Sequence, residues 1–416
     1  MLDKPTILHI DINSYFATMM QQEVPSLRGK PVGIVKDIGR SCVIAASKEA
    51  KKLGVKTGCR AKDAKKLAPN IIFIPAQFDF CLSATKKLKA IFENISPDVH
   101  IYSLDEAFVD VTHCQQYLYH QSPLQLAKVI QKQIKDQLGE WVTCNIGISH
   151  NRLLAKMGSE ISPPDTVFEI NDDNKDAILS TVEFKDVCGV GYRLQEKLKV
   201  LGITHPYQLR FYSLPDLEPY FGPFWVEELH RIAYGEEPHV LRLLDRTLDH
   251  MKSVGRSITG YRVHDNEDEI KRILFNLMEE VTYKVRRMGL AGRYVWIKLY
   301  GSEGRQRWRA HRTLPYYIRH TTEMFQIAYH ELYGAWQRDF KVIKFAVRLG
   351  MLEPLNETPQ TWFPDWHRQE KIYQAMDKIS DKYGLFTLRS GRLLNRDIIR
   401  PEVTGFFGDK TYQLGR

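Results

Sequence analysis

The chain lacks the long apolar runs that cross a membrane, because none of its 416 residues belongs to a stretch of about 18 consecutive apolar positions. Its first residues, MLDKPTILHIDI, carry an acid early and contain no long apolar core, so they do not predict a secretory signal. Cysteine is scarce too: there are six, with no CxxC pair and no zinc-ligand spacing. We therefore expect a cytoplasmic protein with reduced, mostly buried thiols and no membrane partner.

Acidic residues are nearly missing from one basic segment. The formal net charge of the chain is +9, and within residues 284–312 only Glu303 opposes a series of cations. These cations are Lys284, Arg286, Arg287, Arg293, Lys298, Arg305, Arg307, Arg309 and Arg312. Such clustering favours a polyanionic partner more than the total charge does.

The first 170 residues alternate short strands with helices. Strands are predicted at 6–12, 31–35, 41–47 and 141–149, and on both sides of the pair Asp105-Glu106. Helices are predicted at 14–22, 47–54, 80–95, 122–138 and 151–161. This alternation predicts an α+β unit with a mixed or antiparallel sheet.

Residues 171–237 are predicted to be all helical. Within them DVCGVGYRLQEKLKVLGI (186–203) indicates two short helices that meet around Gly189 and Gly191, as in a helix-hairpin-helix. The two glycines let backbone N–H groups approach a phosphate, and the N-terminus of the second helix favours its negative charge. The alternative is an ordinary turn between two helices.

A second α/β unit follows a charged connector at 239–252. Its predicted strands begin at KSVGRSITG and continue at 292–301 and 340–353, and its predicted helices lie at 265–288 and 319–333. In Trp296-Ile297-Lys298-Leu299 an apolar residue alternates with a cationic or aromatic one, so one face of the strand can be buried while the other meets phosphates.

Three carboxylates are the strongest candidates for chemistry: Asp11 at the end of the first strand, and the neighbours Asp105 and Glu106. Carboxylates at a buried strand end need neutralisation, and Mg²⁺ prefers such oxygen ligands. Two ions about 3.5–4 Å apart hold the attacking and leaving oxygens of a phosphoryl transfer. Neighbouring side chains point apart on a flat strand, so the site requires a bend near residue 104. The alternative is that Asp105-Glu106 is only a turn.

Four motifs follow one another in a recognisable order: DINSYFA (11–17), YSLDEAFVDVT (102–112), the hairpin motif at 186–203 and KSVGRS (252–257). In this order and spacing they resemble the Y-family DNA polymerases of the DinB/UmuC-like type over nearly the whole chain. The resemblance implies a template-directed, low-fidelity translesion DNA polymerase with an α+β multidomain, right-hand fold. The implied domains are a palm at 1–14 and 80–170, fingers at 15–79, a helical thumb at 171–237, a linker at 238–249, an α/β little finger at 250–353 and a C-terminal extension at 354–416.

The resemblance also implies which residues bind metal. Asp11 and Asp105 would bridge two Mg²⁺ ions, with Mn²⁺ as an alternative metal. Glu106 would bind the ion that activates the primer 3′-hydroxyl, and the carbonyl of Ile12 would complete the site of the second ion.

Two aromatic residues of DINSYFA have implied roles as well. Phe16 matches the steric gate, a ring that would clash with the 2′-hydroxyl of a ribonucleotide, and Tyr15 would pack against the incoming dNTP. Without the motif, both would be interpreted as core aromatics of a helix.

The triphosphate contacts depart from the commonest family pattern. Many members carry Tyr and Arg at the positions of Lys48 and Lys51, and this stretch is nearer the UmuC branch. Pro163 stands where a phosphate-binding lysine is usual, although Lys156 remains. Lysine neutralises a phosphate as a point charge and lacks the bidentate fork of arginine. The alternative for these lysines is a solvated basic surface.

In the little finger, the resemblance implies contacts with the phosphates of primer–template DNA. The residues concerned are Ser253, Arg256, Arg305, Arg307 and Arg309. Contacts to the DNA backbone hold a duplex in register without reading its sequence. A sliding clamp is a further expected partner, and UmuC-like members also work with an accessory mutagenesis protein. The tail at 401–416 matches no clamp-binding pattern well.

Two other functions stay open at this point. The altered triphosphate contacts fit a non-catalytic DNA-binding adaptor on the same fold, and a nucleotide cyclase on a related palm would explain the three acids. The intact acids favour the polymerase over the adaptor. The hairpin motif and the basic second α/β unit disfavour the cyclase.

Overall fold

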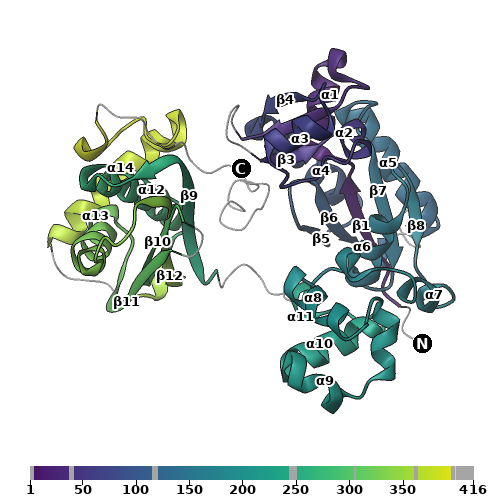
Figure 1. The fold of residues 1–416 in the computed structure, drawn as a ribbon. Coiled ribbons are helices and arrows are strands. Elements are labelled where there is room, and N and C mark those ends of the chain that lie inside the picture. Colours follow the sequence, from purple (N-terminus) through teal and green to yellow (C-terminus); the bar gives the residue numbers. More distant parts are fainter. Residues whose placement is uncertain are drawn as a thin grey trace. The chain divides into compact units, whose positions relative to one another are not determined.

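The structure is a computed structural model that describes residues 4–36, 42–114, 120–242, 251–303, 306–359, 364–394 and 399. The chain divides into two compact units, residues 1–246 and 247–416, whose elements are labelled in Figure 1. Each unit combines sheet and helices around its own core, which confirms the predicted α+β multidomain class.

A five-stranded sheet of order β5-β6-β1-β7-β8 forms the centre of the first unit. Its strands are β1 (Ile7–Ile12), β5 (Val99–Ile101), β6 (Glu106–Asp110), β7 (Cys144–Ser149) and β8 (Val167–Glu169), and its long helices are α4 (Phe78–Glu93), α5 (Pro123–Leu138) and α6 (Arg152–Ile161). β1 pairs antiparallel with both β6 and β7. Its nearly continuous apolar sequence suits this central, two-sided position.

A smaller sheet of order β3-β2-β4 follows β1 in the chain. The elements of this region are α1 (Tyr15–Glu23), β2 (Val32–Val35), β3 (Val43–Ala46), α2 (Lys48–Lys52), α3 (Ala61–Leu67) and β4 (Ile72–Pro75). The hydroxyl of Ser47 accepts a hydrogen bond from the N–H of Ala50 and so caps α2. The sequence patterns predicted β2 and β3 but missed β4, whose four residues show no alternation.

Residues 171–237 are built from helices and short helical turns, as predicted. The helices from residue 171 to the end of the first unit are α7 (Lys175–Leu179), α8 (Tyr192–Val200), α9 (Leu214–Phe221), α10 (Pro223–Ala233) and α11 (His239–Arg242), with 3₁₀ turns η3 (Phe184–Asp186) and η4 (Pro206–Phe211). The first element of the predicted helical hairpin is therefore the single turn η3, and α8 is the second.

A glycine fixes the distance between α6 and the sheet. A Cβ atom at Gly147 on β7 would lie 1.8 Å from the carbonyl oxygen of Ala155 on α6, so no side chain fits there. The side chain of Asn151 caps the start of α6 by accepting from the N–H of Leu154 at 2.9 Å. Together these contacts hold α6 directly against β7 and beside β1.

The second unit contains an antiparallel four-stranded sheet of order β11-β10-β12-β9. Its elements are β9 (Ser253–His264), α12 (Glu267–Arg287), β10 (Leu290–Gly301), β11 (Arg307–Ile318), α13 (Thr321–Phe325), β12 (Val342–Pro354) and α14 (Pro364–Tyr383). Apolar side chains from alternate strand positions join those of α12 and α13 in one core. The opposite face of the sheet lies outside this core.

Strand β11 was not predicted from the sequence. It is an edge strand, and its sequence RWRAHRTLPYYI buries only some alternate positions, so it has no strong apolar pattern. The predicted helix at 319–333 is divided into α13 and a π-helical segment, η7 (Gln326–Leu332).

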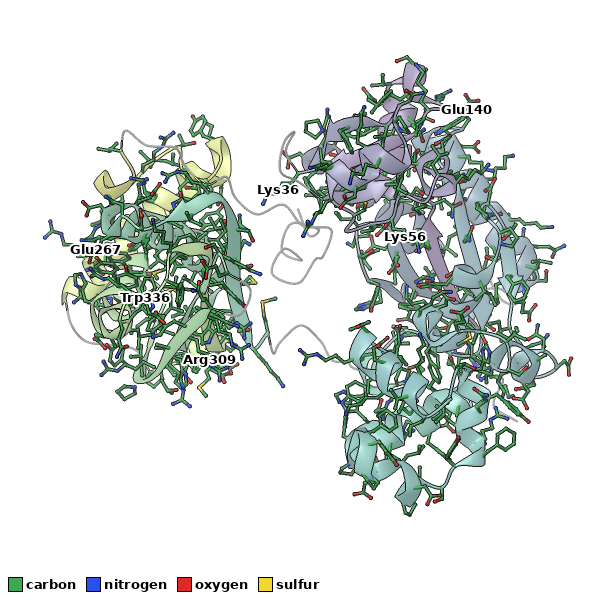
Figure 2. All side chains as sticks on the ribbon, in the orientation of Figure 1. Lys36, Lys56, Glu140, Glu267, Arg309 and Trp336 are labelled. Atoms are coloured by element: carbon green, nitrogen blue, oxygen red, sulfur yellow. The ribbon has the colours of Figure 1, made fainter. Side chains whose placement is uncertain are left out.

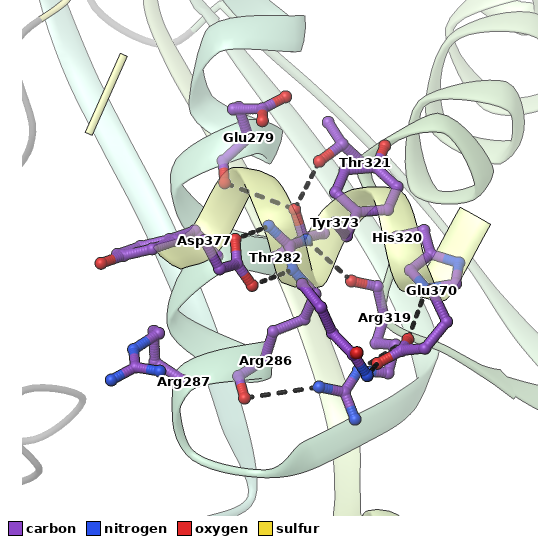
Figure 3. Close-up of polar contacts among 12 residues, drawn as sticks. Glu279, Thr282, Arg286, Arg287, Arg319, His320, Thr321, Glu370, Tyr373 and Asp377 are labelled. Atoms are coloured by element: carbon purple, nitrogen blue, oxygen red, sulfur yellow. Dashed lines mark hydrogen bonds and ion pairs between the residues drawn. The ribbon is translucent and has the colours of Figure 1, made fainter. Parts of the chain in front are cut away.

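The C-terminal helix α14 is attached to α12 by a buried ion pair, shown in Figure 3. The guanidinium of Arg286 donates from Nε and Nη2 to the two carboxylate oxygens of Asp377, both at 2.8 Å. The ring of Tyr373 lies 4.4 Å from the same guanidinium. These contacts pack α14 within the second unit, whereas the sequence analysis assigned residues 354–416 to a C-terminal extension.

A fully buried histidine completes the same network. Nε2 of His320 lies 2.8 Å from Glu370 on α14, Nδ1 lies 3.3 Å from Glu323, and the ring stacks on Tyr373 with centroids 4.9 Å apart. Burial by itself lowers the pKa of His320, but the neighbouring carboxylates of Glu323 and Glu370 raise that pKa above the usual 6.5. The bond to His320 in turn lowers the pKa of Glu370 to about 2.

A raised histidine pKa stabilises the fold below the unfolded value, and this contribution is lost as pH rises through the folded value. We therefore expect the unfolding free energy to fall as pH rises above 6.5, the ordinary histidine pKa, and through the raised pKa of His320. Urea unfolding of the full chain across this range should show a steeper loss for the wild type than for His320→Gln. The exposed His311, replaced by Gln, is the control. Equal slopes for wild type and His320→Gln would contradict the charged pair.

Candidate active site

The three predicted acids meet where β1 and β6 pair. In the strand register Asp11 lies opposite Glu106, and the N–H of Ile12 donates to the carbonyl of Asp105 at 3.0 Å. The chain bends immediately before β6, and the hydroxyl of Ser103 donates to the carboxylate of Asp105 across this bend. The adjacent acids are therefore brought against the end of β1 and do not form an isolated surface turn.

The acids share a poorly hydrated environment. Burial raises the pKa of Asp11 well above its usual value, and the carboxylates of Glu106 and Asp105 raise it further. Burial also raises the pKa of Asp105. Three like charges with little water to screen them are unfavourable unless a cation neutralises them.

This donor set suits a hard divalent cation, since it offers carboxylate oxygens and an excess of buried negative charge. Within the described residues, no three His, Cys, Asp or Glu side chains already surround one ion position. One carboxylate oxygen of Glu106 instead lies 3.0 Å from the ammonium of Lys156 on α6. Lys156, predicted to bind nucleotide, thus contacts the acid cluster itself.

The two aromatic residues after the first strand differ in their surroundings. Tyr15 is 1% exposed, and its hydroxyl donates to the carbonyl of Cys81 at 2.6 Å, so it is a core residue joining α1 to α4. Phe16 is 7% exposed and meets Phe78 edge to face at 5.2 Å. The burial of Tyr15 speaks against the predicted packing of its ring on a nucleotide.

The predicted triphosphate lysines lie on α2. The ammonium of Lys48 donates to the hydroxyl of Thr143 at 2.8 Å, and Thr143 in turn donates to Asn13 at 2.9 Å. Partial burial lowers the pKa of Lys48. Lys51 is exposed one turn later. Lys48 is therefore tied to the end of β1 near Asp11, whereas Lys51 faces solvent.

The two hairpin glycines differ in backbone geometry. Gly189 has φ +91°, which favours glycine, and Gly191 is the N-cap of α8. A Cβ atom at Gly191 would meet nothing within 4 Å, so the backbone there is open to approach.

The face of the second sheet outside the core carries cations and aromatic rings; we call it the open face. Pairing aligns Lys298 with Arg309, and Trp296 with His311 and Arg348. Its members are Tyr294, Trp296, Lys298, Tyr300, Arg307, Arg309, His311, Lys344 and Arg348. Figure 2 labels Arg309 on this sheet. The predicted DNA contacts Arg307 and Arg309 are exposed here.

Arg256 lies on the other side of the sheet. It pairs with Val347, a core position, is 3% exposed, and donates from Nε to Glu280 of α12 at 2.8 Å. This arrangement speaks against its side chain as a phosphate contact, because a strand reverses its face at every residue. Ser253 pairs with Gly350 near the start of β9. Arg305 lies outside the described residues, as does the tail at 401–416.

The basic segment 284–312 is not one continuous patch. Arg286 and Lys284 are buried in ion pairs on α12, the latter 3.1 Å from Glu280, and Arg287 pairs with Asp381 at 3.0 Å. The charges left for a polyanion are mainly those of β10 and β11.

Comparison with known proteins identifies the family. The model of the impB/mucB/samB family matches residues 10–160, and that of its C-terminal domain matches residues 251–361. The DNA polymerase IV of Moorella thermoacetica is 31% identical over 387 residues, or 91% of this chain and 94% of that protein. The DNA polymerase IV of Pelotomaculum thermopropionicum is 32% identical over 380 residues, or 91% and 92%. The chain belongs to the Y family of DNA polymerases.

This Y-family chain is a translesion DNA polymerase of the DinB/UmuC-like type, and the adaptor and cyclase alternatives are not favoured. A solved Y-family DNA polymerase chimera matches its fold with a TM-score of 0.72 at 21% identity, covering 83% of this chain and 98% of that one. None of the helices in the described ranges is both long and apolar enough to cross a bilayer.

Several residues of the active site and of the open face were missed from the sequence. Ser103, which holds Asp105, lies inside the motif YSLDEAFVDVT but was given no role, and Glu160, which lies 3.0 Å from Lys156, stands outside the motifs. Lys344 and Arg348 lie on the open face. In KVIKFAVRLG these cations occupy alternate positions among apolar residues, a pattern that could have revealed them.

Proposed function

We propose that this polymerase extends a DNA primer along a template, with dNTP as substrate, and that Asp11, Asp105 and Glu106 are its catalytic centre. The observation that carries the proposal is the pairing of Asp11 with Glu106 across β1 and β6. This pairing gathers carboxylates that are far apart in the sequence. Family membership supports the reaction, and the geometry supports the choice of residues.

The carboxylates of Asp11, Asp105 and Glu106 and the carbonyl of Ile12 would hold divalent cations, Mg²⁺ or Mn²⁺. Bound cations would stabilise the charge that develops in phosphoryl transfer. The chain itself fixes the positions of the carboxylates: the strand register places Asp11 opposite Glu106, and the hydroxyl of Ser103 restrains Asp105. These ligands would then need little rearrangement during the reaction.

Residues of α1 and α2 would select and grip the nucleotide. Phe16, supported by Phe78 and by the rigid Tyr15, would exclude a ribose 2′-hydroxyl. Lys48, held beside β1 through Thr143, and the exposed Lys51 would neutralise the triphosphate. The role of Tyr15 would then be support and not contact.

The domains follow from the same proposal. The five-stranded sheet would be the palm (1–14 and 80–170), and the small sheet the fingers (15–79). The helical part (171–237) would be the thumb, joined by a linker (238–249) to the little finger (250–353), on which α14 of the C-terminal extension (354–416) packs. Backbone N–H groups near Gly189 and Gly191, and side chains of the open face, would bind DNA phosphates. A sliding clamp and an accessory mutagenesis protein stay expectations from the resemblance.

Replacement of Asp105 tests the catalytic centre. Asp105→Ala should reduce primer extension at least about 100-fold, because a charged group at the reacting centre is lost. Extension should be measured on undamaged and damaged templates with Mg²⁺, together with DNA binding, which should be unchanged. Asp63→Ala, an exposed acid on α3, is the matched control. Full activity in Asp105→Ala would remove this carboxylate from the mechanism.

Replacement of Phe16 tests sugar selection. Phe16→Ala should increase ribonucleotide incorporation relative to dNTP on the order of 100-fold, because steric exclusion of the hydroxyl is lost. Tyr15→Phe, which keeps the ring and removes only the buried hydroxyl, should leave the ratio unchanged. If single-nucleotide kinetics give the same ratio for Phe16→Ala and the wild type, another residue is the gate.

Replacement of Arg307 and Arg309 tests the open face. If each neutralises one phosphate, the double Gln variant should lower the slope of log affinity against log salt by about 1.8, or about 0.9 per contact. The matched control is the double Gln variant of Lys371 and Lys378, which removes the same charge from α14. A slope equal to that of the control would place duplex binding elsewhere.

A further inference from the structure

Lys156 occupies an unusual position for a residue predicted to grip a triphosphate. Its side chain is 9% exposed, and its ammonium lies 3.0 Å from Glu106 and 3.0 Å from Glu160. The ring of Tyr102 lies 5.5 Å from the same ammonium. The cation is therefore enclosed by the acid cluster and its neighbours and is directed at Glu106.

The backbone of Lys156 is fixed as firmly as its side chain. Its carbonyl accepts from the hydroxyl of Ser159 at 2.8 Å, and that hydroxyl lies 2.6 Å from Nδ1 of the fully buried His9 on β1. The close approach at Gly147 keeps α6 on the sheet. Lys156 thus projects toward Glu106 from a helix that has little room to move.

The charges of the cluster explain why a cation is needed there. Asp11, Asp105 and Glu106 interact as like charges in a buried setting, and Lys156 is the cation that acts on both Asp11 and Asp105 from α6. The side chain of Glu106 is 18% exposed, so water alone solvates it poorly. Without Lys156, Glu106 would turn away from the two aspartates.

We propose that Lys156 is a positioning residue that holds Glu106 in the acid cluster before a divalent cation arrives, and that it thereby sets how tightly the site binds that cation. This inference rests on the proposed function, because it assumes that the three acids bind metal. It replaces the predicted contact between Lys156 and the triphosphate.

The two roles predict different changes in Lys156→Met. For a positioning residue, loss of the ammonium that holds Glu106 in the cluster should weaken binding of the cation by about tenfold. Turnover should fall by about tenfold because Glu106 is no longer oriented, while KM for dNTP changes little. For a triphosphate contact, KM for dNTP should rise, and cation binding without nucleotide should stay as in the wild type.

Binding of Mn²⁺ alone to the full chain, measured by electron paramagnetic resonance without DNA or dNTP, separates these roles. Lys156→Met should bind Mn²⁺ more weakly than the wild type, Lys156→Arg should restore wild-type affinity, and the exposed Lys62→Met is the matched control. Thermal unfolding with and without Mn²⁺ gives a second readout, in which Lys156→Met should be less stable without the ion and gain less on its addition.

Asp105→Asn separates failure of this inference from failure of the metal site. If the wild type and Asp105→Asn bind Mn²⁺ equally, the proposed metal site is wrong and the inference falls with it. If Asp105→Asn binds more weakly but Lys156→Met matches the wild type, the metal site stands and the role of Lys156 is overturned.

Discussion

Mutual repulsion among three partly buried carboxylates is the constraint on which the active site of the first unit depends. Asp11, Asp105 and Glu106 are held together by strand pairing, which is strong enough to oppose their repulsion because β1 is bonded on both sides. The same repulsion gives the site its affinity for cations. Lys156 relieves part of it in the absence of metal, and it can do so only because Gly147 lets α6 lie directly on the sheet.

In the second unit, some arginines stabilise the fold through buried ion pairs, and others are exposed for binding. Arg256 and Arg286 are buried and paired with acids of α12 and α14, where an unpaired partner would be costly. Arg307 and Arg309 lie on the open face, where a phosphate can reach them. Successive residues of a strand point to opposite faces of the sheet, so basic residues that are close in the sequence can lie in the core or on the open face.

Much of the fold could be predicted because its signals are local. The apolar run that ends at Asp11, the bend before Glu106 and the glycines of the hairpin each follow from a few adjacent residues. Strand β11 could not be predicted, because an edge strand that buries only part of one face has a weak pattern. The hydrogen bond that fixes Tyr15 in the core could not be predicted either, since its partner Cys81 lies 66 residues away.

The sequence by itself determined the chemistry available to this protein: three acids, an aromatic pair, a glycine hairpin and a basic second half in the order of a Y-family polymerase. Only the tertiary structure decided which charged side chains are paired and which are exposed. It directed Lys156 to Glu106 and Arg256 to Glu280, and it left Arg309 exposed. The physical reason is that a charge must be paired or hydrated, and its burial depends on contacts between residues that are distant in the chain.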